Sequence, residues 1–261
     1  MPDFPPLGID ASRPNVARVY DYFLGGKDNF AADRELAERL LALDPGLRQW
    51  FRDNRAFVCA AVARAVSEGG VTQFLDLGAG LPTRPSVHEA AWQHNPDAKV
   101  VYIDLDPVAV LHAQALLPKN PLLIAFQADL TDPPSVLDHP DLAATVDLDR
   151  PVGVILGAIT HLLPADVLSK SVAAYVARLA PGSWLMISGG YSEDEETYTS
   201  MQSAYTAATT YRHSPEMFAS FFTGMRIVPP GVVEAKRWVN GLDTPPPAEG
   251  AYVRCAAGIK P

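Results

Sequence analysis

Three aspartates follow three apolar segments of this chain, and two glycines accompany the first of them. Asp76 precedes Gly78 and Gly80 in FLDLGAG, Asp104 ends VVYID, and Asp129 follows LIAFQA. Glycines at the end of a strand let the backbone approach a ligand where a side chain would clash. A carboxylate beside them can accept hydrogen bonds from both hydroxyls of a ribose, and another can accept from an adenine amine. Each aspartate alone is more often a turn residue or helix cap, but together and in this order they favour a nucleoside pocket.

Two other nucleotide motifs fit the chain poorly. A dinucleotide fingerprint needs a third glycine where this sequence has Thr83, which is flanked by prolines. A P-loop needs a serine or threonine after its Gly-Lys pair, but Gly26 and Lys27 are followed by Asp28. The residue pattern therefore excludes a P-loop and argues against a dinucleotide site.

Five short apolar segments alternate with segments of helical pattern through the middle of the chain. They span residues 72–78, 99–106, 122–130, 152–159 and 183–190. Near-continuous apolar strands separated by helices are typical of a parallel sheet that is covered on both faces. Residues 225–239 and 251–260 predict two further strands, which would form a hairpin at the end of the sheet. The sequence therefore predicts the α/β class, in which ligands bind at the carboxyl ends of the strands.

The N-terminal part predicts helices with one break. The pattern is helical from Pro14 to Asp44, with Ser12 as a plausible cap, and a long helix fits residues 47–67. Gly25 and Gly26 interrupt the first of these segments. The question is whether this break is a linker or the rim of a ligand site.

The aromatic residues beside the break argue against a flexible linker, which is usually poor in them. We interpret the glycines as the end of one helix, where backbone passes close to a ligand. Asp28 or Asn29 would then cap the next helix, whose free N–H groups could receive a carboxylate. The alternative is a simple helix–turn–helix elbow with solvated charges.

Four stretches of this sequence together resemble one known family. They are NVARVYDYFLGGKDNFAADRE at 15–35, FLDLGAGLPT at 74–83, VYIDLDP at 101–107 and FFTGMRIVPPGVV at 221–233. From about Ser12 onward the chain resembles the bacterial S-adenosyl methyltransferase family, long catalogued as a domain of unknown function. That family belongs to the class I S-adenosylmethionine-dependent methyltransferases.

The resemblance implies a Rossmann-like fold with a seven-stranded, mostly parallel sheet, an antiparallel last strand, helices on both faces and an N-terminal helical cap. We expect residues 1–11 to be flexible and 12–261 to form a single methyltransferase domain. Within it, 12–70 would be the cap and 71–261 the core, with a helical insertion at 191–220.

The resemblance also implies where S-adenosylmethionine would bind. One group of residues follows the strands: Asp76, Gly78, Ala79, Gly80, Asp104, Leu105, Asp129 and Leu130. The other group lies around the N-terminal break: Arg18, Tyr22, Gly25, Gly26 and Lys27. Asp104 would hold the ribose hydroxyls and Asp129 would lie at the adenine. Arg18 or Lys27 would pair with the methionyl carboxylate.

His161 is the candidate catalytic residue, because it follows the segment 152–159 and histidine titrates near neutrality. It could equally cap a helix or touch the cofactor. Four tyrosines in 191–211 either pack against the core or present their faces to a sulfonium by cation–π attraction. The acidic run at 193–196 is most simply a solvated helix start.

Composition excludes several classes of partner. The formal net charge is −9, and no cluster of Lys and Arg provides a nucleic-acid surface. No run of about 18 apolar residues predicts a membrane span. Cys59 and Cys255 lack metal or redox spacing, and no metal site is expected. The first ten residues do not read as a signal peptide, so we expect a cytoplasmic protein.

We therefore predict an enzyme that transfers a methyl group from S-adenosylmethionine to oxygen or nitrogen of a small-molecule acceptor. Three alternatives stay open at this point. They are a regulatory cofactor-binding protein without catalysis, an NAD-type oxidoreductase, and a methyltransferase that acts on protein or RNA.

Overall fold

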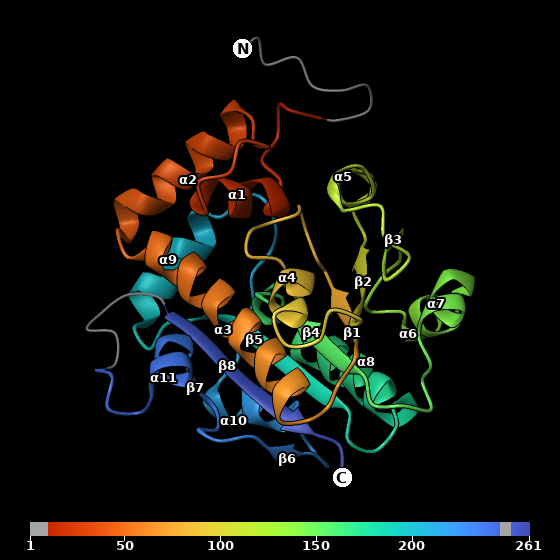
Figure 1. Cartoon of the computed structure of the whole chain (residues 1–261). Helices are drawn as coiled ribbons and strands as arrows, with labels where there is room; N and C mark the ends of the chain where they lie inside the picture. The colour runs from red at the N-terminus through yellow and green to blue at the C-terminus, as the bar shows by residue number, and fades with distance from the viewer. Residues whose placement is uncertain (1–9, 246–251) are drawn as a thin grey trace.

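The computed structural model describes residues 10–245 and 252–261, and most of the predicted flexible segment 1–11 lies outside them. Within the described part, eight strands form one sheet in the order β3-β2-β1-β4-β5-β8-β6, with β7 paired to β8 (Figure 1). The strands are β1 (Gln73–Leu77), β2 (Lys99–Asp104), β3 (Leu123–Gln127), β4 (Gly153–Leu156), β5 (Trp184–Tyr191), β6 (Arg226–Ile227), β7 (Val233–Glu234) and β8 (Tyr252–Ile259). The first five strands are parallel to one another, and β8 is antiparallel to β5. The predicted α/β class and antiparallel last strand are confirmed.

The strand order reverses between β1 and β4, because the chain runs outward from β1 to β3 and then returns to the other side of β1. In open parallel sheets, a crevice for ligands forms at such a switch point, beyond the carboxyl ends of the strands. All five residues of β1 are buried. The first strand is thus a fixed floor for any site at this edge.

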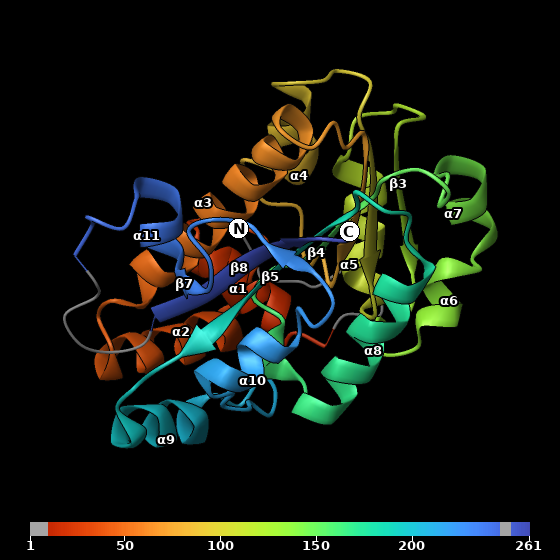
Figure 2. The same ribbon diagram turned by 90° about the horizontal axis from the view of Figure 1, so that it is seen from below.

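Helices cover both faces of the sheet, as predicted (Figure 2). They are α1 (Val16–Phe23), α2 (Ala31–Leu43), α3 (Leu47–Ser67), α4 (Val87–Trp92), α5 (Pro107–Leu116), α6 (Pro133–Leu137), α7 (Pro140–Thr145), α8 (Ala165–Arg178), α9 (Glu195–Ala204), α10 (Pro215–Ser220) and α11 (Ala235–Asn240), with a 3-10 turn η1 (Thr160–Leu162). Alternate residues of a strand point to opposite faces of the sheet. The apolar residues on the two faces therefore belong to two separate clusters. One joins the sheet to α3, α4 and α11, and the other joins it to α6, α8 and α10.

The prediction of a single strand at 225–239 is wrong. Only the two-residue strands β6 and β7 pair with β8, and α11 follows directly. Pro229 and Pro230 lie between the two pieces and have no N–H to donate to a ladder, so the strand is interrupted there. The sheet therefore has eight strands in the described residues rather than the expected seven.

The N-terminal helices occur where the sequence predicts them, with α3 at the expected bounds. The first helix is capped by Asn15 rather than Ser12, because the Asn15 side chain accepts from the N–H groups of Ala17 and Arg18. Figure 1 shows α1 and α2 above the carboxyl edge of the sheet. By contrast, α3 packs against β4, β5 and β8. Residues 47–67 thus lie against the sheet itself, although the division into cap and core stays a prediction.

The double glycine ends α1 and makes a tight elbow. Gly25 has a φ of 81°, in the left-handed region that favours glycine. A Cβ on Gly26 would lie 1.8 Å from a carboxylate oxygen of Asp21. That carboxylate accepts from the Asp28 N–H at 2.9 Å and the Asn29 amide at 2.8 Å. Both residues thus serve the elbow, and neither caps α2 as predicted.

The start of α2 is fixed instead by Asp33, which has no exposed surface. Its carboxylate accepts from the N–H groups of Asn15 and Phe30, both at 2.8 Å, and from the Arg18 Nε at 2.7 Å. These three bonds join the first turn of α1 to the first turn of α2. They satisfy a charge that would otherwise be costly to bury.

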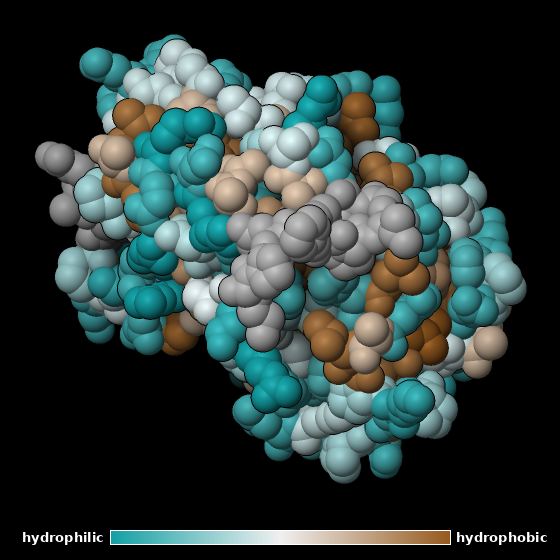
Figure 3. Space-filling model, turned by 90° about the horizontal axis from the view of Figure 1, so that it is seen from above, coloured by the Kyte–Doolittle hydropathy of each residue, from teal (hydrophilic) through white to brown (hydrophobic). Residues whose placement is uncertain are grey.

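Most of the surface seen from above is polar, and hydrophobic side chains appear there as separate patches (Figure 3). Among the residues described, no helix has both the length and the apolar character needed to cross a membrane.

Replacing Arg18 by alanine tests the Asp33 contact. The change leaves a buried carboxylate without its cation, so we expect the free energy of unfolding to fall by about 3–5 kcal/mol. Denaturant unfolding would measure it. Arg39→Ala on the exposed face of α2 is the matched control, and we expect a change within about 0.5 kcal/mol there. Equal effects of the two substitutions would contradict the structural role of Arg18.

Candidate functional site

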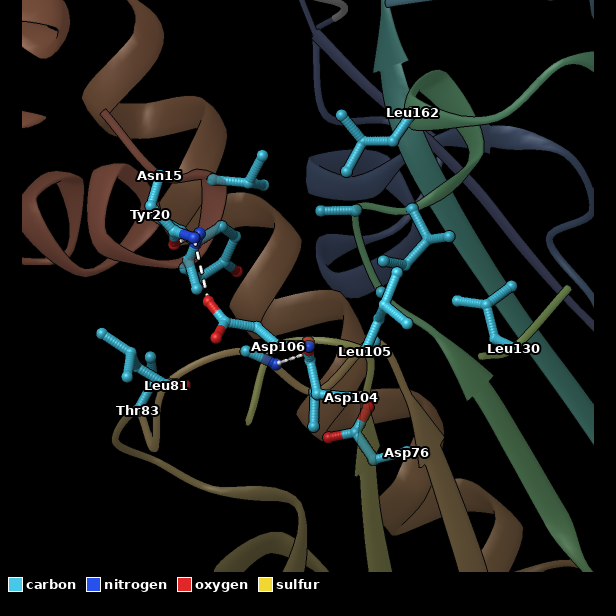
Figure 4. Close-up of a pocket in the computed structure, with 18 of the residues that line it drawn as sticks. Asn15, Tyr20, Asp76, Leu81, Thr83, Asp104, Leu105, Asp106, Leu130 and Leu162 are labelled. Atoms are coloured by element: carbon cyan, nitrogen blue, oxygen red, sulfur yellow. Dashed lines mark hydrogen bonds between the residues drawn. The ribbon is translucent and has the colours of Figure 1, made fainter. Parts of the chain in front are cut away.

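A cavity of about 520 Å³ lies at the carboxyl ends of β1 to β4. Its walls come from α1 and α3, from the loops after β1, β2 and β3, and from the segment between β4 and η1. Figure 4 shows Asn15 and Tyr20 on one side, Leu130 and Leu162 on the other, and Asp76 at the floor. The volume lies within the range of small-molecule and cofactor sites.

The glycine loop after β1 forms the part of the wall that the sequence predicts. Gly78 and Gly80 have φ values of 71° and 64°, which side chains rarely tolerate. A Cβ on Gly78 would lie 2.4 Å from Ile159, and one on Gly80 would lie 3.6 Å from Ala17. Backbone N–H groups of Gly78 and Ala79 donate to the Ile103 carbonyl. The loop is therefore tied to β2 and brings bare backbone to the cavity.

Asp104 ends β2 and organises this loop. One carboxylate oxygen accepts from the Gly80 N–H at 2.7 Å, and the other accepts from the Asp106 N–H at 2.8 Å. Burial raises the pKa of Asp104, and the hydrogen bonds from Asp106 and Gly80 oppose that rise. Asp106 in turn caps α5 and accepts from the Asn15 amide at 2.9 Å, which joins α1 to the sheet edge. The Asp104 and Asp106 bonds drawn in Figure 4 thus hold two walls together.

Asp76 is different because no hydrogen bond joins its carboxylate to any residue that the structure describes, although it lines the cavity. Burial raises its pKa to about 6, with Arg55 opposing the rise and Asp104 adding to it. Arg55, from α3, is the one basic side chain among the described lining residues. Its Nε donates to the Pro85 carbonyl in the segment that follows the glycine loop. A buried carboxyl group and a guanidinium cation therefore line the same cavity.

The other residues predicted along the strands also line the cavity: Leu105, Asp129 and Leu130. Asp129 lies just beyond β3 and accepts from the backbone N–H and hydroxyl of Thr131 at 2.8 and 2.7 Å. Leu105 is 60% exposed and lines the cavity beside Asp104. All eight residues of the predicted strand group are thus brought together.

The N-terminal group is not brought to the cavity: Arg18, Tyr22, Gly25, Gly26 and Lys27 are absent from its lining. Arg18 is paired with Asp33, and the Tyr22 hydroxyl bonds to Glu38 on α2. Lys27 is exposed on the elbow. The helix itself is correctly placed, but its other face is used, through Val16, Ala17 and Tyr20.

Tyr20 and Asn54 are site residues that sequence reasoning missed. The Asn54 amide nitrogen donates to the Tyr20 hydroxyl at 2.8 Å, and its oxygen accepts from the Ser188 hydroxyl at 2.6 Å. The Ser188 oxygen also accepts from the Ala158 N–H at 2.9 Å. Only the helical period of α1 could have signalled this, because Tyr20 lies one turn after Val16 on the same face.

A second, smaller cavity of about 110 Å³ adjoins the first and shares Val16, Tyr20 and Ala158 with it. Ala158 has a φ of 60°, the one positive value outside glycine among the described residues. Such strain is retained where the surrounding structure enforces it, often at functional sites. The second cavity lies between α1, α2, α3 and α9.

His161, the predicted catalytic residue, lines this second cavity and not the first. Its Nδ1 accepts from the Gly190 N–H at 3.1 Å, which leaves the proton on Nε2. Burial lowers its pKa to about 4. A neutral ring whose lone pair is already occupied is a poor base. In the described ranges, no cluster of His, Cys, Asp or Glu is arranged to hold a metal ion.

The raised pKa of Asp76 gives a test with a definite sign. A native-state pKa of about 6 against 3.8 means that ionising Asp76 opposes folding above pH 6 and not below about pH 4. We expect Asp76→Asn to increase the free energy of unfolding at pH 7.5 by about 1–3 kcal/mol. The gain should shrink as the pH is lowered from 6 to 4. Asp149→Asn, at an exposed position, is the control. A gain that does not change with pH would contradict the assignment.

The sequence matches the model of a family described as S-adenosyl methyltransferase over residues 4–260. The crystal structure of a proposed methyltransferase from Thermobifida fusca is 37% identical, with a TM-score of 0.91 and coverage of 99% of both chains. A DUF574 family protein from Streptomyces avermitilis is 32% identical, with a TM-score of 0.85 and coverage of 97% of this chain and 99% of that one. Among curated proteins none matches.

A more distant likeness concerns the fold alone. Human N-acetylserotonin methyltransferase, solved in complex with SAM, is 13% identical with a TM-score of 0.51, over 95% of this chain and 63% of that one. The Rossmann-like class I methyltransferase fold is thereby confirmed. Because the family model spans nearly the whole chain and two solved relatives exceed 30% identity, this protein belongs to the S-adenosyl methyltransferase family.

Proposed function

We propose that this S-adenosylmethionine-dependent methyltransferase methylates oxygen or nitrogen of a small molecule. The observation that carries the proposal is the pair of adjoining cavities, one of cofactor size and one small and apolar, which share Val16, Tyr20 and Ala158. The formal charge of −9 supports a partner other than nucleic acid. A cytoplasmic location stays a prediction.

The larger cavity fits the cofactor at its methionyl end. Asp76 is a carboxylate without a hydrogen-bond partner among the described residues, and a cationic amine would satisfy it. Arg55 supplies the opposite charge for the methionyl carboxylate, the role that sequence reasoning gave to Arg18 or Lys27. Gly78 and Gly80 leave room beside these groups for a ligand to approach the backbone.

The nucleoside end fits by the same argument. We assign the ribose hydroxyls to Asp104, whose two oxygens each accept one backbone bond and retain a further lone pair. Leu105, Asp129 and Leu130 lie beyond it along the sheet edge, where the adenine would be held. The exposed side chain of Leu105 is available for an apolar ring to pack on.

When bound, the cofactor supplies a methyl group whose bond to sulfur breaks as a lone pair of the acceptor bonds to the carbon, while the electron pair stays on sulfur. The protein's own residues mainly orient the two partners and exclude water. Asp76, Asp104, Asp106 and Asp129 surround the cavity with negative charge, which favours a sulfonium cation over the neutral product. A proton released by the acceptor would go to solvent, because His161 is a poor base.

One alternative keeps a specific observation in its favour. A cofactor-binding protein without catalysis needs no proton acceptor near the methyl site, and His161 does not serve as one. Methyl transfer to an amine or an already ionised oxygen needs none either, because the cofactor carries the leaving group. The narrow second cavity, lined by α9, also argues against a folded protein or RNA as acceptor.

Arg55→Ala tests the methionyl assignment. We expect the Kd for S-adenosylhomocysteine, measured by calorimetry, to rise about 10- to 100-fold, as for a lost hydrogen bond to a charged group. Arg52→Ala, one turn earlier and exposed on the same helix, should leave it unchanged. If the Arg55 variant keeps both the native melting temperature and the wild-type affinity for S-adenosylhomocysteine, Arg55 does not bind the methionyl carboxylate.

A labelled-methyl assay tests the acceptor class. We expect transfer of the label from S-adenosylmethionine into the small-molecule fraction of a cell extract, and none into its protein or RNA fractions. The Asp76→Asn variant serves as the control for enzyme-dependent transfer. Labelled protein or RNA would contradict the proposal. If no fraction becomes labelled although the cofactor binds tightly, the non-catalytic alternative would be favoured.

A further inference from the structure

The second cavity, called the side chamber below, is built by segments far apart in the chain. Val16 and Tyr20 come from α1, Leu40 from α2, and Trp50 from α3. The opposite wall comes from the segment after β5, through α9 and the residues that follow it. Contacts between α2 and α9 close the space between these walls. The N-terminal motif and the insertion thus meet at one chamber.

Two glycines near the end of β5 allow neighbouring groups of the chamber wall to pack closely against the strand. A Cβ on Gly189 would lie 1.7 Å from the Thr160 hydroxyl oxygen, and one on Gly190 would lie 3.3 Å from the Trp50 ring. Trp50 meets His161 edge-on, with ring centroids 5.8 Å apart. The two glycines therefore let η1 and Trp50 pack directly on the strand.

The lining carries no formal charge. Among the described residues around the chamber there is no Asp, Glu, Lys or Arg, and His161 is neutral because burial lowers its pKa. Aromatic and apolar side chains dominate, notably Trp50, Phe51, Met201 and Tyr205. A charged ligand group would lose its hydration here without contacting an opposite charge on the lining, because Arg212 and Arg254 lie against the tyrosine rings instead. The chamber therefore selects for uncharged groups.

One buried hydroxyl favours a ligand with an acceptor atom. The Tyr198 hydroxyl oxygen is buried and has no hydrogen-bond partner of normal geometry among the described residues, although the Thr210 side chain lies close to it. The Tyr20 hydroxyl accepts from Asn54 and keeps its own proton, and His161 carries its proton on Nε2. A buried hydroxyl without a partner is costly, so a ligand that accepts from Tyr198 is favoured.

Two of the four tyrosines predicted near the sulfonium already face cations of the protein itself. The Arg254 guanidinium lies 3.4 Å from the centre of the Tyr191 ring, and Arg212 lies 5.4 and 5.8 Å from Tyr191 and Tyr198. For the other tyrosines, a contact with the sulfonium stays a prediction.

We propose that the side chamber is the methyl-acceptor subsite, and that it takes an uncharged group about the size of one aromatic ring bearing a hydrogen-bond acceptor. The volume of about 110 Å³ is near that of cavities of about 150 Å³ that hold benzene. Shared residues at the junction place such a group next to the cofactor cavity. This inference rests on the proposed function.

The test uses the full chain saturated with S-adenosylhomocysteine and measures binding of phenol and benzyl alcohol, each a single ring with an oxygen acceptor, by ligand-observed NMR. Benzoate and benzylamine are the charged counterparts of the same size. Met201→Trp fills the chamber, and Met217→Trp on exposed α10 is the matched control. We expect phenol and benzyl alcohol to bind the wild type and the Met217 variant, and to bind the Met201 variant at least tenfold more weakly. We expect the charged probes to bind the wild type at least tenfold more weakly than phenol does.

The outcomes separate the two proposals. Failure of S-adenosylhomocysteine to bind the wild type would overturn the cofactor assignment itself. Normal cofactor binding in both tryptophan variants, with equal phenol binding in both, would overturn the chamber as the acceptor subsite and leave the cofactor site standing. Benzoate or benzylamine binding as well as phenol would overturn the requirement for an uncharged group.

Discussion

The buried carboxylate of Asp33 is the constraint on which the site depends. A charge without exposed surface must find partners, and here the partners are the N–H groups of Asn15 and Phe30 and the guanidinium of Arg18. Their positions fix where α1 begins relative to α2. From that position Asn15 reaches Asp106 at the sheet edge. One buried charge thus holds the N-terminal helices over the carboxyl ends of the strands.

The polar bonds that follow from this placement run through the whole site. Tyr20 meets Asn54 on α3, Asn54 meets Ser188 on β5, and Ser188 holds the strained backbone at Ala158. The two cavities share Tyr20 and Ala158, so this series of bonds marks the boundary between them. The two cavities are therefore parts of one connected framework, with the glycine loop as a wall of the larger one.

The sequence was informative wherever local pattern decides structure. Strand periodicity and the Asp76, Gly78 and Gly80 pattern located the sheet and its ligand edge, and the double glycine correctly ended α1. The sequence does not determine which face of α1 points toward the cavity. That rotation depends on the ion pair of Arg18 with the buried Asp33, fifteen residues later, which keeps Arg18 out of the cavity. Arg55 could not be predicted for a similar reason. A basic residue on a long helix is usually solvent-exposed, and only the tertiary packing of α3 brings Arg55 to the same cavity as Asp76. The sixth predicted strand, at 225–239, is split because Pro229 and Pro230 have no N–H to donate to a ladder.

Helix α9 has no fully buried residue, although it supplies one wall of the side chamber. An element with so little of its surface in the core opens locally at small energetic cost and tolerates substitution. The cofactor wall, in contrast, is built from buried strands and constrained glycines. We expect lineages of this family to diverge in the molecules they modify through changes in α9 and the facing side of α2, while the donor side stays almost invariant. The architecture thus separates what must be kept from what selection is free to alter.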